Sequence, residues 1–259
     1  MSKELHLEVG AGVAWLTVDR PEVRNALSAA LCREIADRLN ELALDTAVRV
    51  VVLRGAGEKV FVSGADINEF TESLASPQSA LDYDANAELM QTAIRKLPKP
   101  VIAMIQGYAV GSGCIVAVAC DFRIASTAAR FGVPVAKFGF VAPVPDVLRL
   151  AHLVGPAKAK WIMMTGKLLD AKRALEIGLV DEVVEPAQLQ EATEAFARVL
   201  ADNAPLTHKV TKEIIEEYTA PSNDVYAGRK WYEEVFSSGD FREGLDAFFT
   251  KRRPDFKGK

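Results

Sequence analysis

The sequence has few of the residues that hold metal ions or disulfide frameworks. It contains three cysteines and three histidines among 259 residues, and no two cysteines form a CxxC pair. This pattern predicts neither a zinc site nor a disulfide framework. Cys32, Cys114 and Cys120 are therefore interpreted as small buried residues. A formal net charge of −4 argues against a general nucleic-acid binder, which usually carries a basic face.

Long apolar runs are also missing. Residues 1–10 contain no apolar stretch of signal-peptide length, and no run approaches the roughly 18 apolar residues of a membrane span. The most apolar region, 101–119, is interrupted by Gln106, Gly107 and Ser112. We therefore expect a cytoplasmic protein whose partners include neither a membrane nor nucleic acid.

Hydrophobic periodicity predicts strands alternating with helices over residues 1–203. Residues 5–9 and 13–18 read as a hairpin, and residues 28–42 as a helix that Ser28 caps. Further strands are expected at 48–53, 101–105, 122–125 and 182–184, and further helices at 79–97, 156–165, 170–177, 187–201, 207–218, 222–237 and 239–250. The pattern predicts an α/β core over 1–203, followed by a purely helical region over 204–259.

Three glycine-bearing segments connect predicted strands to the elements that follow them. They are 61–70 (FVSGADINEF), 107–114 (GYAVGSGC) and 131–139 (FGVPVAKFG). Backbone amides at such a helix start have no partner within the helix and carry the positive end of its dipole. Two sources of free amides, brought together, can hold a developing oxyanion. Each segment taken alone is more simply interpreted as a chain reversal.

In this order and spacing, the segments resemble those of the enoyl-CoA hydratase/isomerase family, also called the crotonase superfamily. The resemblance covers nearly the whole chain and rests on these segments: Asp19-Arg20-Pro21, Asn25-Ala26-Leu27, Ser63-Gly64-Ala65-Asp66-Ile67, 107–114, 120–125, Phe131-Gly132-Val133-Pro134, 171–180, 241–244, Phe248, Lys251 and Arg252. It implies a crotonase-like spiral of β-β-α turns with a C-terminal helical oligomerisation region. It also implies a homo-oligomer, a trimer or a dimer of trimers.

The resemblance implies oxyanion donors at the backbone amides of Ala65 and Ser112. Ser112 stands where glycine is common in the family, but serine keeps the N–H group. The resemblance assigns contacts with an acyl-CoA thioester to Val23, Arg24, Ser63, Ala65, Ile67, Phe248 and Lys251. Asn68 replaces a lysine that is often found two residues after the aspartate matched by Asp66. No metal is expected, and no cofactor apart from the coenzyme A of the substrate.

The chain departs from the family at its acid–base positions. Family hydratases carry two glutamates that share a water molecule, and Ile115 and Val135 occupy those positions here. Pro143 occupies the position of an aspartate used in the isomerase and dehalogenase branches. Each positioned acid–base group contributes about 10²–10⁴-fold in rate, whereas one oxyanion donor contributes on the order of 3 kcal/mol. The sequence predicts an enzyme that keeps the oxyanion donors and lacks the usual acid–base groups.

Asp146 is the leading candidate for a replacement acid, and its alternative role is to cap a helix beginning at Val147. Three functions therefore stay open. The chain is a hydratase or isomerase with replacement groups, a decarboxylase that relies on the oxyanion hole, or a noncatalytic acyl-CoA binding protein. A homo-oligomer is also predicted from apolar residues in the C-terminal helices: Ile214, Ile215, Tyr218, Tyr226, Trp231 and Phe236.

Overall fold

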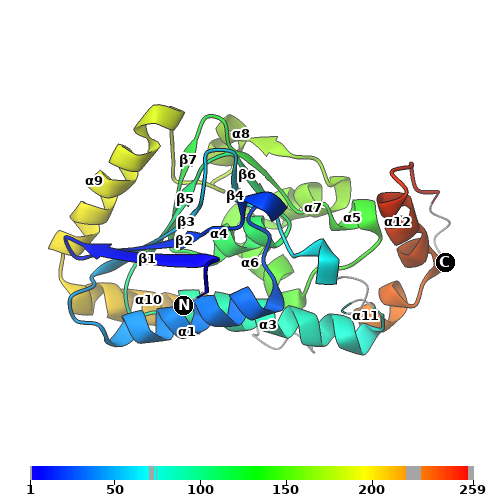
Figure 1. The fold of residues 1–259 in the computed structure, drawn as a ribbon, viewed down its shortest axis with the longest axis horizontal. Coiled ribbons are helices and arrows are strands. Elements are labelled where there is room, and N and C mark those ends of the chain that lie inside the picture. The colour runs from blue at the N-terminus through cyan, green and yellow to red at the C-terminus, as the bar shows by residue number, and fades with distance from the viewer. Residues whose placement is uncertain (1, 70–72, 74, 220–228, 256–259) are drawn as a thin grey trace.

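The computed structural model describes residues 2–69, 73, 75–219 and 229–255. Tyr226 and the side chains of Tyr218 and Trp231 lie outside the described part. Figure 1 shows two sheets enclosed by helices, with the C-terminal helices α11 and α12 at one end of the molecule. No helix in the described ranges is long and apolar enough to cross a membrane.

The larger sheet has six strands and is parallel except at one edge. Its order is β1 (Leu5–Gly10), β2 (Val13–Val18), β3 (Val50–Gly55), β5 (Val101–Ile105), β7 (Phe122–Ser126) and β10 (Glu182–Val184). Strands β1 and β2 form the predicted antiparallel hairpin, and the other neighbours are parallel. Every strand predicted from the sequence is therefore present in this sheet.

The smaller sheet has four short strands that were not predicted as separate elements. They are β4 (Val60–Val62), β6 (Tyr108–Val110), β8 (Arg130–Gly132) and β9 (Leu169–Asp170), of which the first three are mutually parallel. Strands β3, β5 and β7 of the large sheet lead in turn to β4, β6 and β8. The chain therefore visits both sheets in each turn, which is the expected spiral of β-β-α turns.

Helices cover the sheets and make up the C-terminal region. Helix α1 begins where expected, because the Ser28 side chain accepts a hydrogen bond from Leu31 N at 3.1 Å. The helices are α1 (Ala29–Leu44), α3 (Pro77–Lys96), α4 (Ser112–Ala119), α5 (Val135–Phe138), α6 (Val144–Val154), α7 (Pro156–Thr165), α8 (Ala171–Glu176), α9 (Leu189–Asp202), α10 (Pro205–Thr219), α11 (Arg229–Phe236) and α12 (Gly239–Phe249). Within the described residues, 3-10 turns span Pro21–Val23, Ile67–Glu69 and Pro186–Gln188.

The large sheet is buried on both faces, which explains the continuous apolar run in β3. Val50 and Val52 face a cluster that includes Leu189 and Leu200 of α9. Alternate residues of the same strands face the main core with α1, α3 and α4. Because both faces are covered, the strands read as uninterrupted runs of Val, Ile and Leu.

Helix α4 lies unusually close to strand β4. A Cβ atom added at Gly113, the second residue of α4, would lie 2.0 Å from the carbonyl oxygen of Val62. A real Cβ cannot occupy that position, so any larger residue must push α4 away from β4. The glycine therefore sets the distance between the start of α4 and the end of β4.

We expect Gly113→Ala to destabilise the protein by about 1–3 kcal/mol, the usual cost of overpacking a well-packed site. Gly10→Ala is the matched control, because a Cβ added there meets no atom within 4 Å. Urea denaturation of both variants measures the difference. Equal midpoints for the two variants would contradict the close approach of α4 to β4.

Candidate active site

Two glycine loops meet at one edge of the small sheet. Strands β4 and β6 are parallel neighbours, so their carboxyl ends lie at the same edge. The loop containing Gly64 follows β4, and the loop containing Gly111 follows β6. A Cβ added at Gly64 would lie 3.2 Å from the carbonyl oxygen of Val110 and 3.8 Å from the amide nitrogen of Ser112. The space between the two backbones is therefore no larger than a methyl group would fill.

Both glycines adopt backbone conformations that other residues avoid. Gly64 has φ 122° and Gly111 has φ 57°, and both values lie in the region that favours glycine. The residues that directly follow these glycines, Ala65 and Ser112, both line one small pocket. These glycines belong to segments 61–70 and 107–114, which the sequence analysis selected for their glycines.

The amides of Ala65 and Ser112 are available to a ligand. Leu27 N donates to Gly64 O and Asp66 N donates to Leu27 O, each at 2.9 Å, so Leu27 pairs with the neighbours of Ala65 on both sides. In a parallel bridge this leaves the N–H of Ala65 pointing away from Leu27. Ser112 is the first residue of α4, where no intrahelical acceptor exists. No acceptor for either N–H occurs among the described residues.

A buried ion pair holds the Ala65 loop in place. Arg20 Nη2 lies 2.9 Å from Asp66 Oδ2, and Arg20 Nη1 donates to Ala26 O at 2.7 Å. The other carboxylate oxygen of Asp66 accepts hydrogen bonds from the backbone and side-chain nitrogens of Asn68 at 3.0 and 2.9 Å. Asp66 therefore caps the 3-10 turn Ile67–Glu69.

Glu69, the last residue of the same 3-10 turn, makes a contact with helix α1. Its Oε2 atom accepts a hydrogen bond from Ala29 N, the first residue of α1, at 3.0 Å. An acidic group at a helix start also interacts favourably with the helix dipole. Glu69 therefore fastens the Ala65 loop to α1.

A small pocket opens beside the two free amides. Residues from α1, α3 and both glycine loops line it: Leu27, Ala29, Cys32, Ala65, Tyr83, Asp84, Asn86, Ala87 and Ser112. Burial raises the pKa of the Cys32 thiol to about 12, and burial with nearby Glu69 raises the pKa of the Tyr83 hydroxyl. Both groups are therefore protonated at neutral pH, so neither acts there as an anionic nucleophile or base.

The three positions that sequence reasoning marked as lacking an acid carry no charge in the structure. Ile115 lies one turn after Ser112 on α4 and is 1% exposed. Val135 is the first residue of α5 and packs against the main core. Pro143 precedes the first residue of α6. Helix α4 therefore presents an apolar side chain, Ile115, one turn beyond the Ser112 amide.

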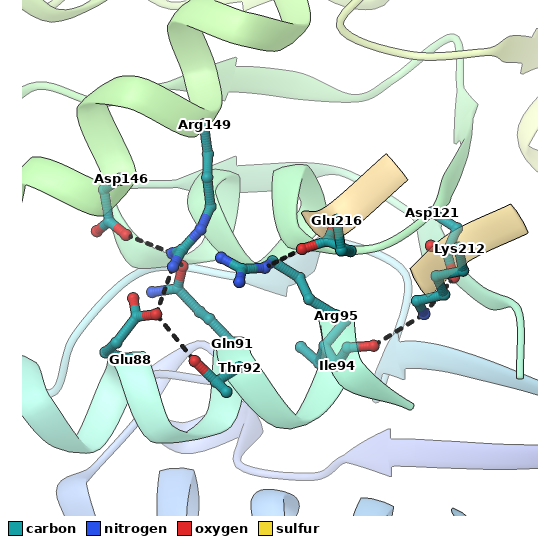
Figure 2. A network of polar contacts seen from close by, with 10 residues as sticks. All are labelled: Glu88, Gln91, Thr92, Ile94, Arg95, Asp121, Asp146, Arg149, Lys212 and Glu216. Carbon is teal, nitrogen blue, oxygen red and sulfur yellow. Dashed lines mark hydrogen bonds and ion pairs between the residues drawn. The ribbon is translucent and has the colours of Figure 1, made fainter. Parts of the chain in front are cut away.

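Asp146 does not have the alternative role considered for it. Helix α6 begins at Val144 rather than Val147, its N-cap position is Pro143, and no side chain caps it. Asp146 is 7% exposed, and its Oδ1 atom lies 3.2 Å from Arg149 Nη1 (Figure 2). Burial raises the pKa of Asp146 to about 7, and Glu88 adds to the rise while Arg149 opposes it. Asp146 is outside the pocket lining that contains Ala65 and Ser112.

Sequence reasoning missed the partners of Asp146. Glu88 and Gln91 of α3 are 7% and 2% exposed, and both bind the Arg149 guanidinium group. In the sequence, polar residues at this spacing on a long helix are typical of a solvated face. Glu88 and Gln91 lie on the same helical face as the pocket residues Asp84 and Ala87, which distinguishes them from solvated residues. This signal can be used only when the position of the pocket is known.

The residues expected to contact coenzyme A lie on two parts of the chain. Ser63 Oγ donates to the carbonyl oxygen of Val23 at 3.5 Å, which joins the start of the Ala65 loop to the Pro21–Val23 turn. Arg24 and Ile67 are exposed beside these segments.

Phe248 and Lys251 belong to the second part. Phe248 of α12 packs edge-on against Phe138 of α5 with ring centroids 5.1 Å apart. Lys251 is exposed just beyond α12. Figure 1 shows α12 beside α5, at the end of the molecule.

A larger cleft of about 900 Å³ lies elsewhere, between α10 and the ends of α3, α4 and α6. Its lining includes Arg95, Arg149 and Lys212 but neither Ala65 nor Ser112. The free amides, rather than cavity size, are the reason that the smaller pocket is the candidate site. The described residues contain no cluster of three or more His, Cys, Asp or Glu side chains that could hold a metal ion.

Comparisons with known proteins agree with this geometry. The family model described as enoyl-CoA hydratase/isomerase matches residues 8–259. A short-chain-enoyl-CoA hydratase of Clostridium acetobutylicum is 36% identical over 249 residues, with 95% of each chain covered. A carnitinyl-CoA dehydratase of Escherichia coli K12 is 36% identical over 265 residues, with 100% of each chain covered.

A solved structure extends the similarity to three dimensions. A methylmalonyl-CoA decarboxylase in complex with 2-nitronate-propionyl-CoA superimposes with a TM-score of 0.89 at 28% identity and covers 100% of both chains. The spiral of β-β-α turns is therefore the crotonase fold. This chain belongs to the enoyl-CoA hydratase/isomerase family, whose members act on acyl-CoA thioesters.

Proposed function

We propose that this chain is an enzyme that stabilises the enolate of an acyl-CoA thioester between the backbone amides of Ala65 and Ser112. The observation that carries the proposal is the convergence of two N–H groups, without acceptors among the described residues, beside one small pocket. Hydrogen-bond donors fixed in place before the reaction are worth most where negative charge develops. Coenzyme A enters as part of the substrate, and no other cofactor is invoked.

The proposed enzyme is a poor hydratase of simple straight-chain enoyl-CoA. Hydration needs one group to activate water and one to protonate the α-carbon. Ile115, Val135 and Pro143 can do neither. Asp146, with a pKa raised to about 7, is the replacement proton carrier that we propose, because a pKa near the working pH suits a general acid or base.

The proposed coenzyme A contacts are Val23, Arg24, Ser63, Ala65 and Ile67 around the oxyanion hole, with Phe248 and Lys251 from the C-terminal region. The Ser63–Val23 hydrogen bond supports a continuous surface leading to the amides. Residues 204–259 form the proposed oligomerisation region, and we keep the cytoplasmic location predicted above.

Decarboxylation of a malonyl-type thioester is the second candidate. The similarity to the methylmalonyl-CoA decarboxylase structure, which covers both chains completely, favours it. An apolar wall at Ile115 and Val135 would destabilise a substrate carboxylate, and the free amides would stabilise the enolate left by loss of CO₂. Binding without turnover of any thioester would instead identify a noncatalytic acyl-CoA binding protein.

We expect Ser112→Pro to lower the turnover of the best acyl-CoA substrate by about 10²–10³-fold, because it removes one oxyanion donor. Proline is tolerated at the first position of a helix, so α4 is retained. Ser112→Gly keeps the N–H group and is the matched control, expected to stay within a few-fold of the native rate. Equal rates for the two variants would show that the Ser112 amide is not a donor to the transition state.

We expect crotonyl-CoA hydration by the native chain to be slower by about 10²–10⁴-fold than in a variant with a working carboxylate pair, here Ile115→Glu with Val135→Glu. Absorbance at the enoyl thioester band follows hydration. Release of CO₂ from malonyl- and methylmalonyl-CoA tests decarboxylation, the second candidate, in parallel.

Calorimetry with acetyl-CoA and longer thioesters measures binding separately. Native hydration at hundreds of turnovers per second, or no binding of any thioester, would overturn the proposal.

A homo-oligomer, either a trimer or a dimer of trimers, is the proposed assembly. Helix α10 exposes Leu206, Val210, Ile214 and Ile215, with exposed fractions of 74%, 49%, 52% and 53%. The first three recur every four residues and form one apolar stripe, which a monomer would leave in water. Light scattering at micromolar concentration is expected to give three or six times the mass of 28.1 kDa, and a monomer mass would refute the assembly.

A further inference from the structure

We propose that Glu69 and Tyr83 are positioning residues of the oxyanion hole, which hold the backbone of Ala65 in the orientation that presents its N–H group to the substrate. Both act through contacts that join the Ala65 loop to helices α1 and α3. This inference rests on the proposed function and names the side chains on which one of its two donors depends.

A single parallel bridge holds the backbone at Ala65. Leu27 pairs with Ala65 in an isolated bridge that belongs to neither sheet. Its two hydrogen bonds, from Leu27 N to Gly64 O and from Asp66 N to Leu27 O, are each 2.9 Å long. Within a sheet, neighbouring pairs repeat such bonds along the strand, whereas here two bonds set the direction of the Ala65 N–H group. The orientation of this donor therefore depends on what holds Leu27 and the residues after Ala65.

Tyr83 reaches Leu27 from helix α3. Its hydroxyl donates to the Leu27 carbonyl oxygen at 3.4 Å, and the same oxygen accepts the Asp66 amide. Burial raises the pKa of the Tyr83 hydroxyl, and the charge of Glu69 and a hydrogen bond with Glu69 add to the rise. The hydroxyl therefore keeps its proton at neutral pH. This proton lies between two acceptors, the Leu27 carbonyl oxygen and the Glu69 carboxylate.

Glu69 joins the end of the Ala65 loop to α1. Its Oε2 atom accepts a hydrogen bond from Ala29 N at 3.0 Å. Ser28 already caps α1 through Leu31 N, so the helix does not need Glu69 in order to begin. The positive end of the helix dipole strengthens the contact with the Glu69 carboxylate. Helices α1 and α3 pack against each other (Figure 1), and Glu69 accepts one hydrogen bond from each of them.

These contacts lie at the wall of the candidate pocket. Leu27, Ala29 and Tyr83 line the pocket together with the two donor residues, Ala65 and Ser112. Ser112 is the first residue of α4, so its amide is fixed by a different element. Loss of the carboxylate or the hydroxyl would therefore loosen one donor and leave the other in place. The expected effect is smaller than that of deleting a donor outright.

Turnover of the best acyl-CoA substrate and its dissociation constant, measured side by side, test the assignment. Glu69→Ala and Tyr83→Phe are each expected to lower kcat by about tenfold, the order of effect of one lost hydrogen bond. The dissociation constant is expected to stay within about twofold, because the positioned donor matters most in the transition state. The double variant is expected to lose much less than the product of the two single effects, because both side chains hold one loop.

The ¹³C chemical shift of a thioester labelled at its carbonyl carbon reports the position of the donors in the bound state. It is expected to move downfield when the native protein binds the ligand. Part of this change is expected to be lost in Glu69→Ala and in Tyr83→Phe. A side chain that only stabilises the fold would not alter the shift of the bound ligand, and urea denaturation of each variant measures stability separately.

Two conservative variants serve as controls. Glu69→Gln keeps an acceptor oxygen for Ala29 N and is expected to retain kcat within about threefold of the native value. Tyr108→Phe is the matched control for Tyr83→Phe, because Tyr108 of β6 is 48% exposed. It is expected to leave kcat and the ¹³C shift unchanged.

Native kcat and native ¹³C shift in both Glu69→Ala and Tyr83→Phe would overturn the positioning role alone. A lower kcat with an unchanged ¹³C shift, or with a parallel loss of binding, would overturn it as well. If the native protein binds no thioester, or leaves the ¹³C shift at its value in water, the proposed function fails together with this inference.

Discussion

The close approach of two backbones at the end of the small sheet is the constraint on which the site depends. Strands β4 and β6 run parallel, so their following loops emerge at the same edge. Gly64, Gly111 and Gly113 let those loops and the start of α4 come within contact distance. Because the donors are backbone amides, they are fixed by the sheet and the helix rather than by side-chain rotamers. Such fixed dipoles need little reorganisation as charge develops.

Other features of the fold secure this arrangement from outside. The Arg20–Asp66 ion pair and the Glu69–Ala29 hydrogen bond hold the Ala65 loop against the start of α1. At the other end, α12 packs on α5 so tightly that a Cβ at Gly244 would lie 2.3 Å from Phe138 O. The C-terminal region therefore docks on the segment that follows β8, which is the third of the glycine-bearing segments.

Much of this could be predicted from the sequence. The strands of the large sheet and most helices follow from periodicity, whereas the assignment of oxyanion donors to the amides of Ala65 and Ser112 is what the family resemblance of the glycine segments implies. The small sheet could not be predicted as separate elements, because strands of two or three residues are too short to show a period. Helix α6 was placed three residues late because its first turn contains Pro145, which reads as a breaker although proline is tolerated there.

The buried polar residues of α3 were missed for a different reason. Their partners are distant in sequence: Glu88 and Arg149 are 61 positions apart, and Arg95 and Glu216 are 121 positions apart. Local patterning cannot distinguish a polar face that meets water from one that meets charges supplied by other helices. Figure 2 shows these contacts as neighbouring groups of polar side chains that come from α6, α3 and α10. These polar groups on α3 and α6 lie beside α4, where Ile115 replaces an acid of the family pattern. Asp146 is the member of these groups that we propose as the replacement proton carrier.

The central claim is that the free amides of Ala65 and Ser112 polarise the carbonyl group of a bound acyl-CoA thioester. Isotope-edited infrared spectroscopy of a thioester labelled with ¹³C at its carbonyl carbon measures this directly. Two strong hydrogen bonds weaken the C=O bond, so the account predicts a carbonyl band at lower frequency for the bound ligand than for the ligand in water. A bound ligand whose carbonyl band stays at or above the frequency in water would contradict it.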